Sequence, residues 1–283
     1  SIIPLTSKQW NDLWKAKQAL HKQKHDANFW NERAKSFTNK DTPGSYSDRF
    51  LKLADIHPGE SVMDMGCGTG NLSIPLAISG HRVLAADFSS GMLDKLKERA
   101  LEERLDNIKT VELSWEDDWL ASGIMPKSYD VCLASRSIAT HDLRAALLKL
   151  TAVAKRAVCI TLTCDSSPRI DDRALREIGA EIRPSFDDVY ALAILQGEGY
   201  LPKIDYIKTQ RADLFKSFDQ ALEKYTSMLD AAIAQASLSI PRENAISKLK
   251  DWLHANLIET TNSKDDEKSS RHLCLKEPRN TTW

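Results

Sequence analysis

The 283-residue chain lacks the features that mark several classes of protein. Its 39 Lys and Arg nearly balance its 40 Asp and Glu, so a formal net charge of -1 gives no overall attraction to nucleic acid or to an anionic membrane. No apolar run approaches the length that spans a bilayer, and the opening residues SIIP begin no signal peptide. We therefore expect a cytoplasmic protein that has no membrane partner.

Cysteine is scarce and scattered. The five cysteines stand at positions 67, 132, 159, 164 and 274, which is not the spacing of a zinc site built from C-x-x-C pairs. Their odd number argues against a disulfide framework. Cys132 and Cys159 lie inside apolar runs, where cysteine acts as a small core residue. The sequence therefore predicts no metal site.

Glycine is sparse as well, but three of the 11 glycines stand at alternate positions in one stretch, VMDMGCGTGN at 62–71. The apolar run before them predicts a buried strand, and the pattern after Asn71 predicts a helix. Glycine allows a tight turn and a close approach of backbone to ligand. The N–H groups and partial positive charge of the helix N-terminus favour an anion. This turn is a predicted ligand site.

Strands and helices alternate on both sides of the turn. Predicted strands cover 61–65, 81–87, 108–113, 129–134 and 157–163, and predicted helices cover 7–40, 46–56, 71–79, 91–104 and 142–155. Ser89 and Ser90 are plausible caps of the fourth helix, and Gly80 is placed to end the third. The alternation predicts a doubly wound α/β fold.

Three regions follow from this order. Residues 1–42 form a predicted helical cap whose mixed basic and aromatic side chains suit either a nucleic-acid surface or, as we favour, an amphipathic cover. Residues 43–164 form the core. Residues 165–283 should complete the sheet, with strands at 204–208 and near 273–275 and a helical insertion at about 210–258.

The glycine spacing separates two cofactor classes. Nicotinamide and flavin enzymes use G-x-G-x-x-G around a pyrophosphate, whereas this chain has G-x-G-x-G, with Asn71 in the place of the last dinucleotide glycine. Asp64, two residues before the first glycine, would repel a pyrophosphate but can accept hydrogen bonds or attract an amino group. A dinucleotide is therefore disfavoured.

The stretch resembles the first motif of class I S-adenosylmethionine-dependent methyltransferases, and the resemblance covers residues 29–164 well. It implies a mostly parallel seven-stranded sheet, S-adenosyl-L-methionine as cofactor and S-adenosyl-L-homocysteine as product. Asp87, at the end of the second strand, is implied to accept hydrogen bonds from the ribose hydroxyls. The other implied cofactor-binding residues are Asp64, Gly66, Cys67, Gly68, Gly70, Phe88, Met92, Ser114, Trp115, Glu116 and Ser135.

Each of these residues has a simpler interpretation. Asp87 could cap the next helix, Asp64 could fix the turn, Trp115 could be core, and Cys67 could be a small residue facing the sheet. Their order and spacing together favour the cofactor.

Candidates for catalysis follow the fourth strand, because ligands bind beyond the carboxyl ends of parallel strands. Arg136 suits an acidic group of the substrate, or a structural ion pair with a carboxylate such as Asp142. His141 is a possible base, or a residue at a helix start. Tyr46, with Trp30 and Arg33, resembles the family's N-terminal lid.

The sequence indicates the class of the methyl acceptor less directly than it indicates the cofactor. The chain has neither the [DN]-P-P-[YFW] run of amino-group methyltransferases of bases nor a Pro-Cys pair for cytosine C5 chemistry. We therefore expect methyl transfer to a small molecule rather than to nucleic acid. The alternatives are an RNA or protein methyltransferase that uses the basic N-terminal segment, and a cofactor-binding subunit without catalysis.

Overall fold

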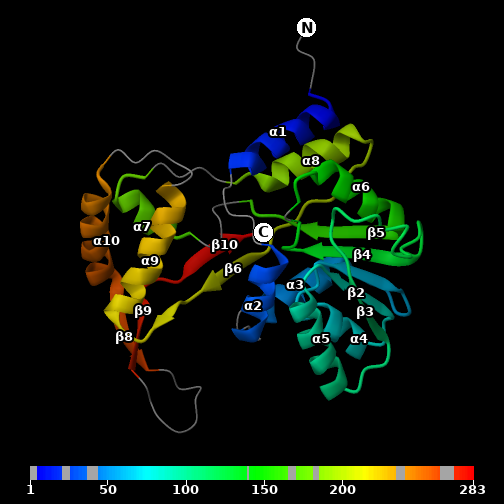
Figure 1. Ribbon diagram of the computed structural model, residues 1–283, viewed down its shortest axis with the longest axis horizontal. Coiled ribbons are helices and arrows are strands. Elements are labelled where there is room, and N and C mark those ends of the chain that lie inside the picture. Colours follow the sequence, from blue (N-terminus) through cyan, green and yellow to red (C-terminus); the bar gives the residue numbers. More distant parts are fainter. Residues whose placement is uncertain are drawn as a thin grey trace. The chain divides into compact units, whose positions relative to one another are not determined.

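The computed structural model describes residues 5–20, 26–36, 44–138, 140–164, 170–180, 185–233, 240–261 and 271–283. The chain divides into two compact units (Figure 1). The first comprises Ser1–Leu162 and Asp187–Ile207, and the second comprises Thr163–Phe186 and Lys208–Trp283. The glycine turn lies in the first unit.

The first unit is built on a parallel sheet of five strands in the order β3-β2-β1-β4-β5. The strands are β1 (Val62–Met65), β2 (Val83–Asp87), β3 (Ile108–Glu112), β4 (Tyr129–Ser135) and β5 (Ala154–Thr161). Every residue of β1 and β2 is buried, as their continuous apolar runs require. The strand order reverses between β1 and β4, and ligands of such sheets bind beyond the carboxyl ends at this reversal. The predicted doubly wound core is confirmed.

The described residues of this unit form the helices α1 (Ser7–Leu20), α2 (Ala27–Ser36), α3 (Gly44–Ala54), α4 (Ser73–Ile78), α5 (Ser90–Glu102), α6 (Leu143–Val153) and α8 (Asp187–Gly197). Helices α1 and α8 lie side by side next to α6, while α2 and α3 lie toward the end of the sheet to which β4 and β5 point (Figure 1). Trp14 of α1 is buried in the main apolar core.

The local signals in the sequence locate most of these helices. Ser89 caps α5 by accepting a hydrogen bond from the Met92 N–H, at 3.2 Å. Gly80 follows α4 with a φ of 89°, a conformation that suits glycine. The predicted helical stretch at 7–40 contains α1 and α2, and its residues 21–25 and 37–40 lie outside the described part of the chain.

The second unit has two antiparallel sheets. One has the strand order β7-β9-β8, from Leu214–Phe215, Arg271–Leu275 and Leu257–Thr261, and the other pairs β6 (Lys208–Arg211) with β10 (Arg279–Thr282). Helices α7 (Asp172–Glu177), α9 (Phe218–Ile233) and α10 (Arg242–Asn256) share an apolar cluster with β9 that includes Tyr225, Leu249 and Leu275.

These strands correct the predicted architecture. Among the described residues, the parallel sheet has five strands rather than seven, because the later strands pair with one another. The strand expected near 273–275 exists as β9, but it pairs with β8 in the register Ile258↔Cys274. The strand expected at 204–208 is wrong, since β6 begins at Lys208. Helices α9 and α10 lie within the predicted insertion at 210–258.

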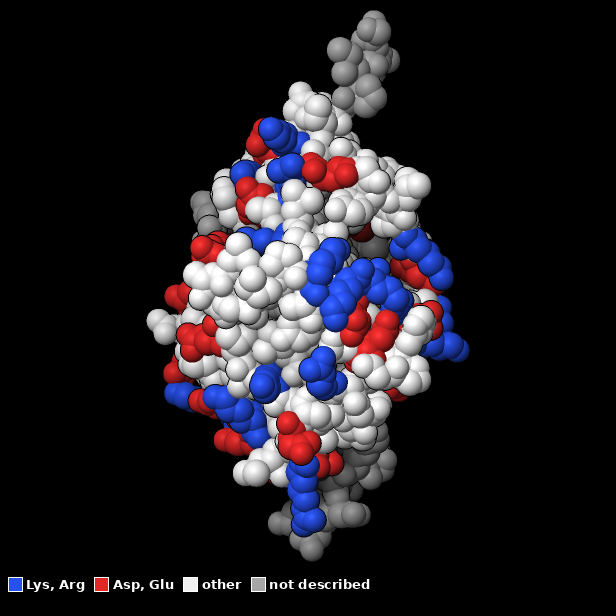
Figure 2. Space-filling view, turned by 90° about the vertical axis from the view of Figure 1, so that its right-hand side faces the viewer, with Lys and Arg blue, Asp and Glu red and all other residues white. Residues whose placement is uncertain are grey.

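None of the described helices is long and apolar enough to cross a membrane. On the face seen in Figure 2, basic and acidic side chains lie next to one another over much of the surface. Such interspersed charges give no broad field of one sign on that face.

Candidate active site

The glycine turn connects β1 to α4, and each of its three glycines has a positive φ, of 73° at Gly66, 54° at Gly68 and 85° at Gly70. A Cβ on Gly66 would lie 2.2 Å from Ser137 Cβ, and one on Gly70 would lie 2.9 Å from Leu96 Cγ. Close packing therefore requires glycine at both positions. A Cβ on Gly68 would meet no atom within 4 Å, so the middle of the turn borders open space that a ligand can approach.

Asp64 lies at the buried end of β1, only 2% exposed. Its Oδ2 accepts a hydrogen bond from Ser73 Oγ at 2.6 Å, which joins the strand to the start of α4. Burial raises the pKa of Asp64 to about 6, and the nearby Asp87 carboxylate adds to the rise. The hydrogen bond from Ser73 supports the interpretation that Asp64 fixes the turn. The Asp64 carboxylate also carries a negative charge that a cationic ligand would stabilise.

Asp87 connects the glycine turn to the loop after β2. One carboxylate oxygen accepts the Gly68 N–H at 2.8 Å, and the other accepts the Ser89 N–H at 2.9 Å. The residue is 6% exposed, and burial raises its pKa. Both donors are neutral, so the carboxylate retains accepting capacity and charge for a ligand at Gly68.

The other predicted residues of these two loops differ in exposure. Met92 is buried and Phe88 is half-buried. Cys67 is buried, and burial raises the pKa of its thiol well above the ordinary value, which suits a neutral side chain facing the sheet. Arg99 of α5 donates to the Thr69 carbonyl and, at 3.2 Å, to Asn71 Oδ1. This support of the turn had no signal in the local sequence pattern.

The loop after β3 is tied to the loop after β4. Trp115 Nε1 donates to the Ser137 carbonyl at 3.0 Å, and Thr140 Oγ1 donates to Glu116 Oε1 at 3.0 Å. Trp115 is 8% exposed and belongs to the main apolar core, as its simpler interpretation suggested. Ser114 accepts the Trp119 Nε1–H through its carbonyl, at 2.9 Å. These contacts fix the wall on which the adenine edge is expected.

A cluster of hydroxyl groups lies at the carboxyl ends of β4 and β5. The Tyr46 hydroxyl is 2.7 Å from Ser135 Oγ and 2.8 Å from Thr161 Oγ1. Tyr46 is 1% exposed, and burial raises its pKa, so its hydroxyl stays protonated near neutrality. Thr161 also accepts the Arg136 N–H at 3.0 Å. Thr161 was not predicted, because its role depends on the pairing of β4 with β5.

Arg136 adds a cation to this cluster. Its guanidinium carbon lies 4.2 Å from the centroid of the Tyr46 ring, and its backbone has a φ of 55°. Asp142 itself pairs with Lys15 at 2.7 Å and caps α6 by accepting the Ala145 N–H at 2.9 Å, and the alternative of a structural ion pair between Arg136 and a carboxylate stays a prediction. Stacking on an aromatic ring fixes the plane of a guanidinium.

His141 is separate from the hydroxyl cluster in its contacts. It is exposed at the residue before Asp142, and it makes no hydrogen bond or ion pair with Tyr46, Ser135 or Arg136, all of which the structure describes. The cap of α6 is Asp142 rather than His141. The predicted role of His141 as a base stays a prediction.

The chain's own groups fit a nucleoside sulfonium. Thr69 Oγ1 is buried without a hydrogen-bond partner in the part of the chain that the structure describes. It lies in the turn beside the open space at Gly68 and near two buried acids whose donors are neutral. Within the described residues, no group of three His, Cys, Asp or Glu is arranged to hold a metal ion.

Comparison with known proteins gives matches over this region. Residues 62–157 match the family model described as "Methyltransferase domain". An uncharacterized protein of Haemophilus influenzae is 33% identical over 168 residues, which are 59% of this chain and 61% of that protein. The malonyl-[acyl-carrier protein] O-methyltransferase of Serratia marcescens is 33% identical over 111 residues, 38% of this chain and 39% of that enzyme. The chain thus spans less than two thirds of the length of these relatives.

Among solved structures, a putative methyltransferase of Bacillus halodurans aligns with a TM-score of 0.48 and 14% identity, over 84% of this chain and 95% of that one. The family match begins at the first residue of β1 and ends within β5, so it covers the strands and loops that form the site. Over residues 62–157, the chain is therefore similar to a methyltransferase domain.

Proposed function

We propose that the protein transfers a methyl group from S-adenosylmethionine to a small molecule that carries an anionic group, and that Arg136 binds this group. The observation that carries the proposal is the position of Arg136 on the Tyr46 ring, at the carboxyl end of β4. This end borders the reversal of strand order between β1 and β4, where ligands of such sheets bind.

The contacts around the glycine turn support a position for the cofactor. Asp87 would accept hydrogen bonds from the ribose hydroxyls, and the backbone of residues 66–70 would approach the methionine part. Asp64 would stabilise the positive charge of the amino and sulfonium groups. Phe88 and Met92 would line the adenine, with Ser114, Trp115 and Glu116 at its edge and Cys67 beneath the turn.

Methyl transfer requires little general acid–base catalysis from the protein. S-adenosylmethionine, when bound, supplies a methyl group on a positive sulfonium; the acceptor's electron pair forms the new bond to carbon, and the carbon–sulfur pair returns to sulfur. Arg136 and the Tyr46–Ser135 hydroxyls would orient the acceptor in line with the methyl group. A neutral O–H or N–H acceptor also releases a proton, for which His141 is the proposed base.

A small acceptor agrees with the charge of the chain. The net charge is -1, which gives no overall attraction to a polyanion. A protein that binds RNA through phosphates needs a concentrated basic surface.

The proposal is tested with the purified protein, S-adenosylmethionine tritiated on the methyl group, and cell extract separated into small anions, other small molecules, RNA and protein. We expect label in the small-anion fraction, and at least tenfold less with Arg136→Gln. Arg82→Gln changes an exposed arginine at the other end of the sheet and should leave labelling unchanged.

Calorimetry separates binding from turnover. S-adenosylhomocysteine should bind to wild type and Arg136→Gln with equal affinity, and NAD should not bind. Label in RNA or protein would contradict the small-molecule acceptor. Binding of the cofactor with no labelled product in any fraction would favour a non-catalytic subunit.

A further inference from the structure

The side chain of Asn31 joins helix α2 to the core by hydrogen bonds. The carboxamide oxygen of Asn31 accepts two hydrogen bonds from the start of α5, one from Ser89 Oγ at 2.7 Å and one from the Gly91 N–H at 3.0 Å. Asn31 therefore completes the N-terminal cap of a helix that is 58 positions further along the chain.

The packing at this contact is tight. A Cβ on Gly91 would lie 3.1 Å from Asn31 Cα and 3.4 Å from the Asn31 carbonyl oxygen. The backbone of α2 thus approaches the first turn of α5 closely, and glycine at position 91 permits the approach. Helix α2 lies on the side of the sheet to which β4 and β5 point (Figure 1).

The same contact extends to Asp87 through Ser89. The Ser89 N–H donates to Asp87 Oδ1 at 2.9 Å, while the Ser89 hydroxyl donates to Asn31 and accepts the Met92 N–H. Ser89 is fully buried, so these partners set its orientation. A change at Asn31 releases the hydroxyl of the residue whose backbone holds the Asp87 carboxylate.

Helix α1 provides a matched contact elsewhere. Asn11 Oδ1 accepts the Arg144 N–H at 2.9 Å at the start of α6, and Asn11 Nδ2 donates to Asp142 Oδ1 at 2.9 Å. The two N-terminal helices therefore make the same kind of cap on two core helices. The α6 cap shares no described hydrogen bond with Asp87 or Ser89.

We infer that Asn31 is a positioning residue for the cofactor, which holds Asp87 in place through Ser89 and couples the docking of α2 to cofactor binding. The inference rests on the proposed contact between Asp87 and the ribose. Because coupling is reciprocal, bound cofactor should also hold α2 more firmly against α5.

The test compares the dissociation constant of S-adenosylhomocysteine for Asn31→Ala, Asn11→Ala and wild type by calorimetry on the full chain. Two lost hydrogen bonds at the cap should weaken binding to Asn31→Ala by about tenfold. Asn11→Ala should bind within twofold of wild type, although its unfolding midpoint falls. In turnover assays, Asn31→Ala should raise the KM for S-adenosylmethionine and leave kcat unchanged.

Two further measurements test whether Asn31 acts on cofactor binding through Asp87 and through the docking of α2. In an Asp87→Asn background, Asn31→Ala should weaken binding by less than twofold more, because the carboxylate that it positions is absent. Hydrogen exchange in Ala27–Ser36 should slow on adding S-adenosylhomocysteine to wild type but not to Asn31→Ala.

The inference is overturned if Asn31→Ala binds like wild type, or if Asn31→Ala and Asn11→Ala weaken binding equally, which is the result of general destabilisation. It is also overturned if the Asn31→Ala effect persists in full in the Asp87→Asn background. If Asp87→Asn itself binds with unchanged affinity, the proposed position of the cofactor fails instead.

Discussion

The acids at the two ends of the parallel sheet have pKa values shifted in opposite directions. At the amino end, the pKa of Glu60 is lowered, chiefly by the Arg156 guanidinium, and hydrogen bonds from Ser61 lower the pKa of Asp130 to about 2. At the carboxyl end, burial raises the pKa of Asp64 to about 6 and also raises that of Asp87.

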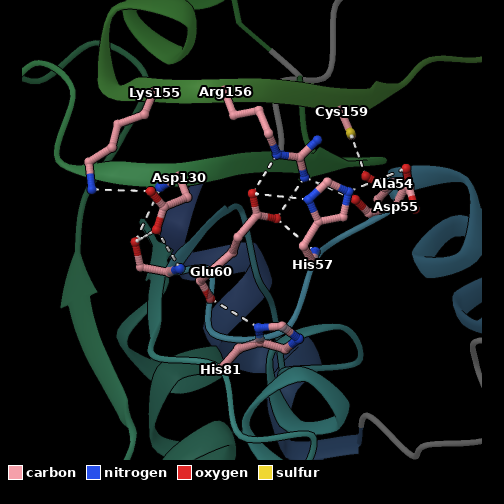
Figure 3. A network of polar contacts seen from close by, with 10 residues as sticks. Ala54, Asp55, His57, Glu60, His81, Asp130, Lys155, Arg156 and Cys159 are labelled. Carbon is pink, nitrogen blue, oxygen red and sulfur yellow. Dashed lines mark hydrogen bonds and ion pairs between the residues drawn. The ribbon is translucent and has the colours of Figure 1, made fainter.

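The amino end satisfies its charges internally. Arg156 binds both carboxylate oxygens of Glu60 and donates to the Asp55 carbonyl at 2.9 Å (Figure 3). Asp130 accepts from the N–H and hydroxyl of Ser61 at 2.8 and 2.7 Å, and Lys155 lies 3.2 Å away. These contacts join the segment between α3 and β1 to β4 and β5. Their effect is to stabilise the fold.

The carboxyl end does not satisfy its charges in this way. Asp64 and Asp87 receive hydrogen bonds from neutral donors, and the Asp87 carboxylate raises the energy of ionised Asp64. A buried acid with a raised pKa in a ligand site lowers stability until a cation arrives. The contrast agrees with the proposal that the carboxyl end of the sheet receives a positively charged ligand.

The largest expected effect is on Asp64→Asn, which removes the buried charge but retains an acceptor for Ser73. Because the pKa of Asp64 is raised on folding, ionisation destabilises the fold as pH rises from about 4 through 6. Without cofactor, the variant should be more stable than wild type by about 2 to 3 kcal/mol at pH 8 and nearly equal at pH 4. Urea unfolding at the two pH values measures this, and a difference that does not depend on pH would contradict it.

Asp130→Asn should have a smaller effect of opposite sign. The pKa of Asp130 is lowered on folding, so its contribution is present above about pH 4 and is lost as pH falls toward 2. We expect a loss of about 1 to 2 kcal/mol at pH 7, the scale of hydrogen bonds to a charged group. Thermal unfolding of the variant and wild type at pH 7 and pH 3 checks this prediction. An equal loss of stability at both pH values would mean that the charge of Asp130 does not cause the loss.

The smallest effect is expected for Lys155→Ala. The lysine side chain is 46% exposed, so its ion pair with Asp130 is screened by water. The free energy of unfolding should fall by less than about 0.5 kcal/mol, and the difference should vanish in 1 M salt. A loss as large as that of Asp130→Asn would show that Lys155, rather than Ser61, stabilises the carboxylate.

The glycine turn and the acids at the carboxyl end of the parallel sheet could be predicted because their sequence signals are local. The apolar run of 62–65, the alternate glycines and the acid at position 87 each depend on a few neighbouring residues, and the five parallel strands follow from the same alternation. The cap at Ser89 was predictable for the same reason.

Contacts between distant segments were not predictable. Asn31 on Ser89, Ser137 over Gly66 and Thr161 beside Tyr46 depend on which elements become neighbours, and no spacing in the chain encodes them. The strands of the second unit show the same limit: β9 carries the apolar pattern of a sheet strand, but it pairs with β7 and β8 rather than with the parallel sheet.

The most direct test of the contrast between the two ends is the number of protons released when S-adenosylmethionine binds at pH 6, obtained by calorimetry in buffers of different ionisation enthalpy. With a pKa of about 6, Asp64 is about half protonated, and a cation beside it should drive the remaining proton off. We predict the release of about half a proton by wild type and almost none by Asp64→Asn. Equal release by both proteins would contradict the account.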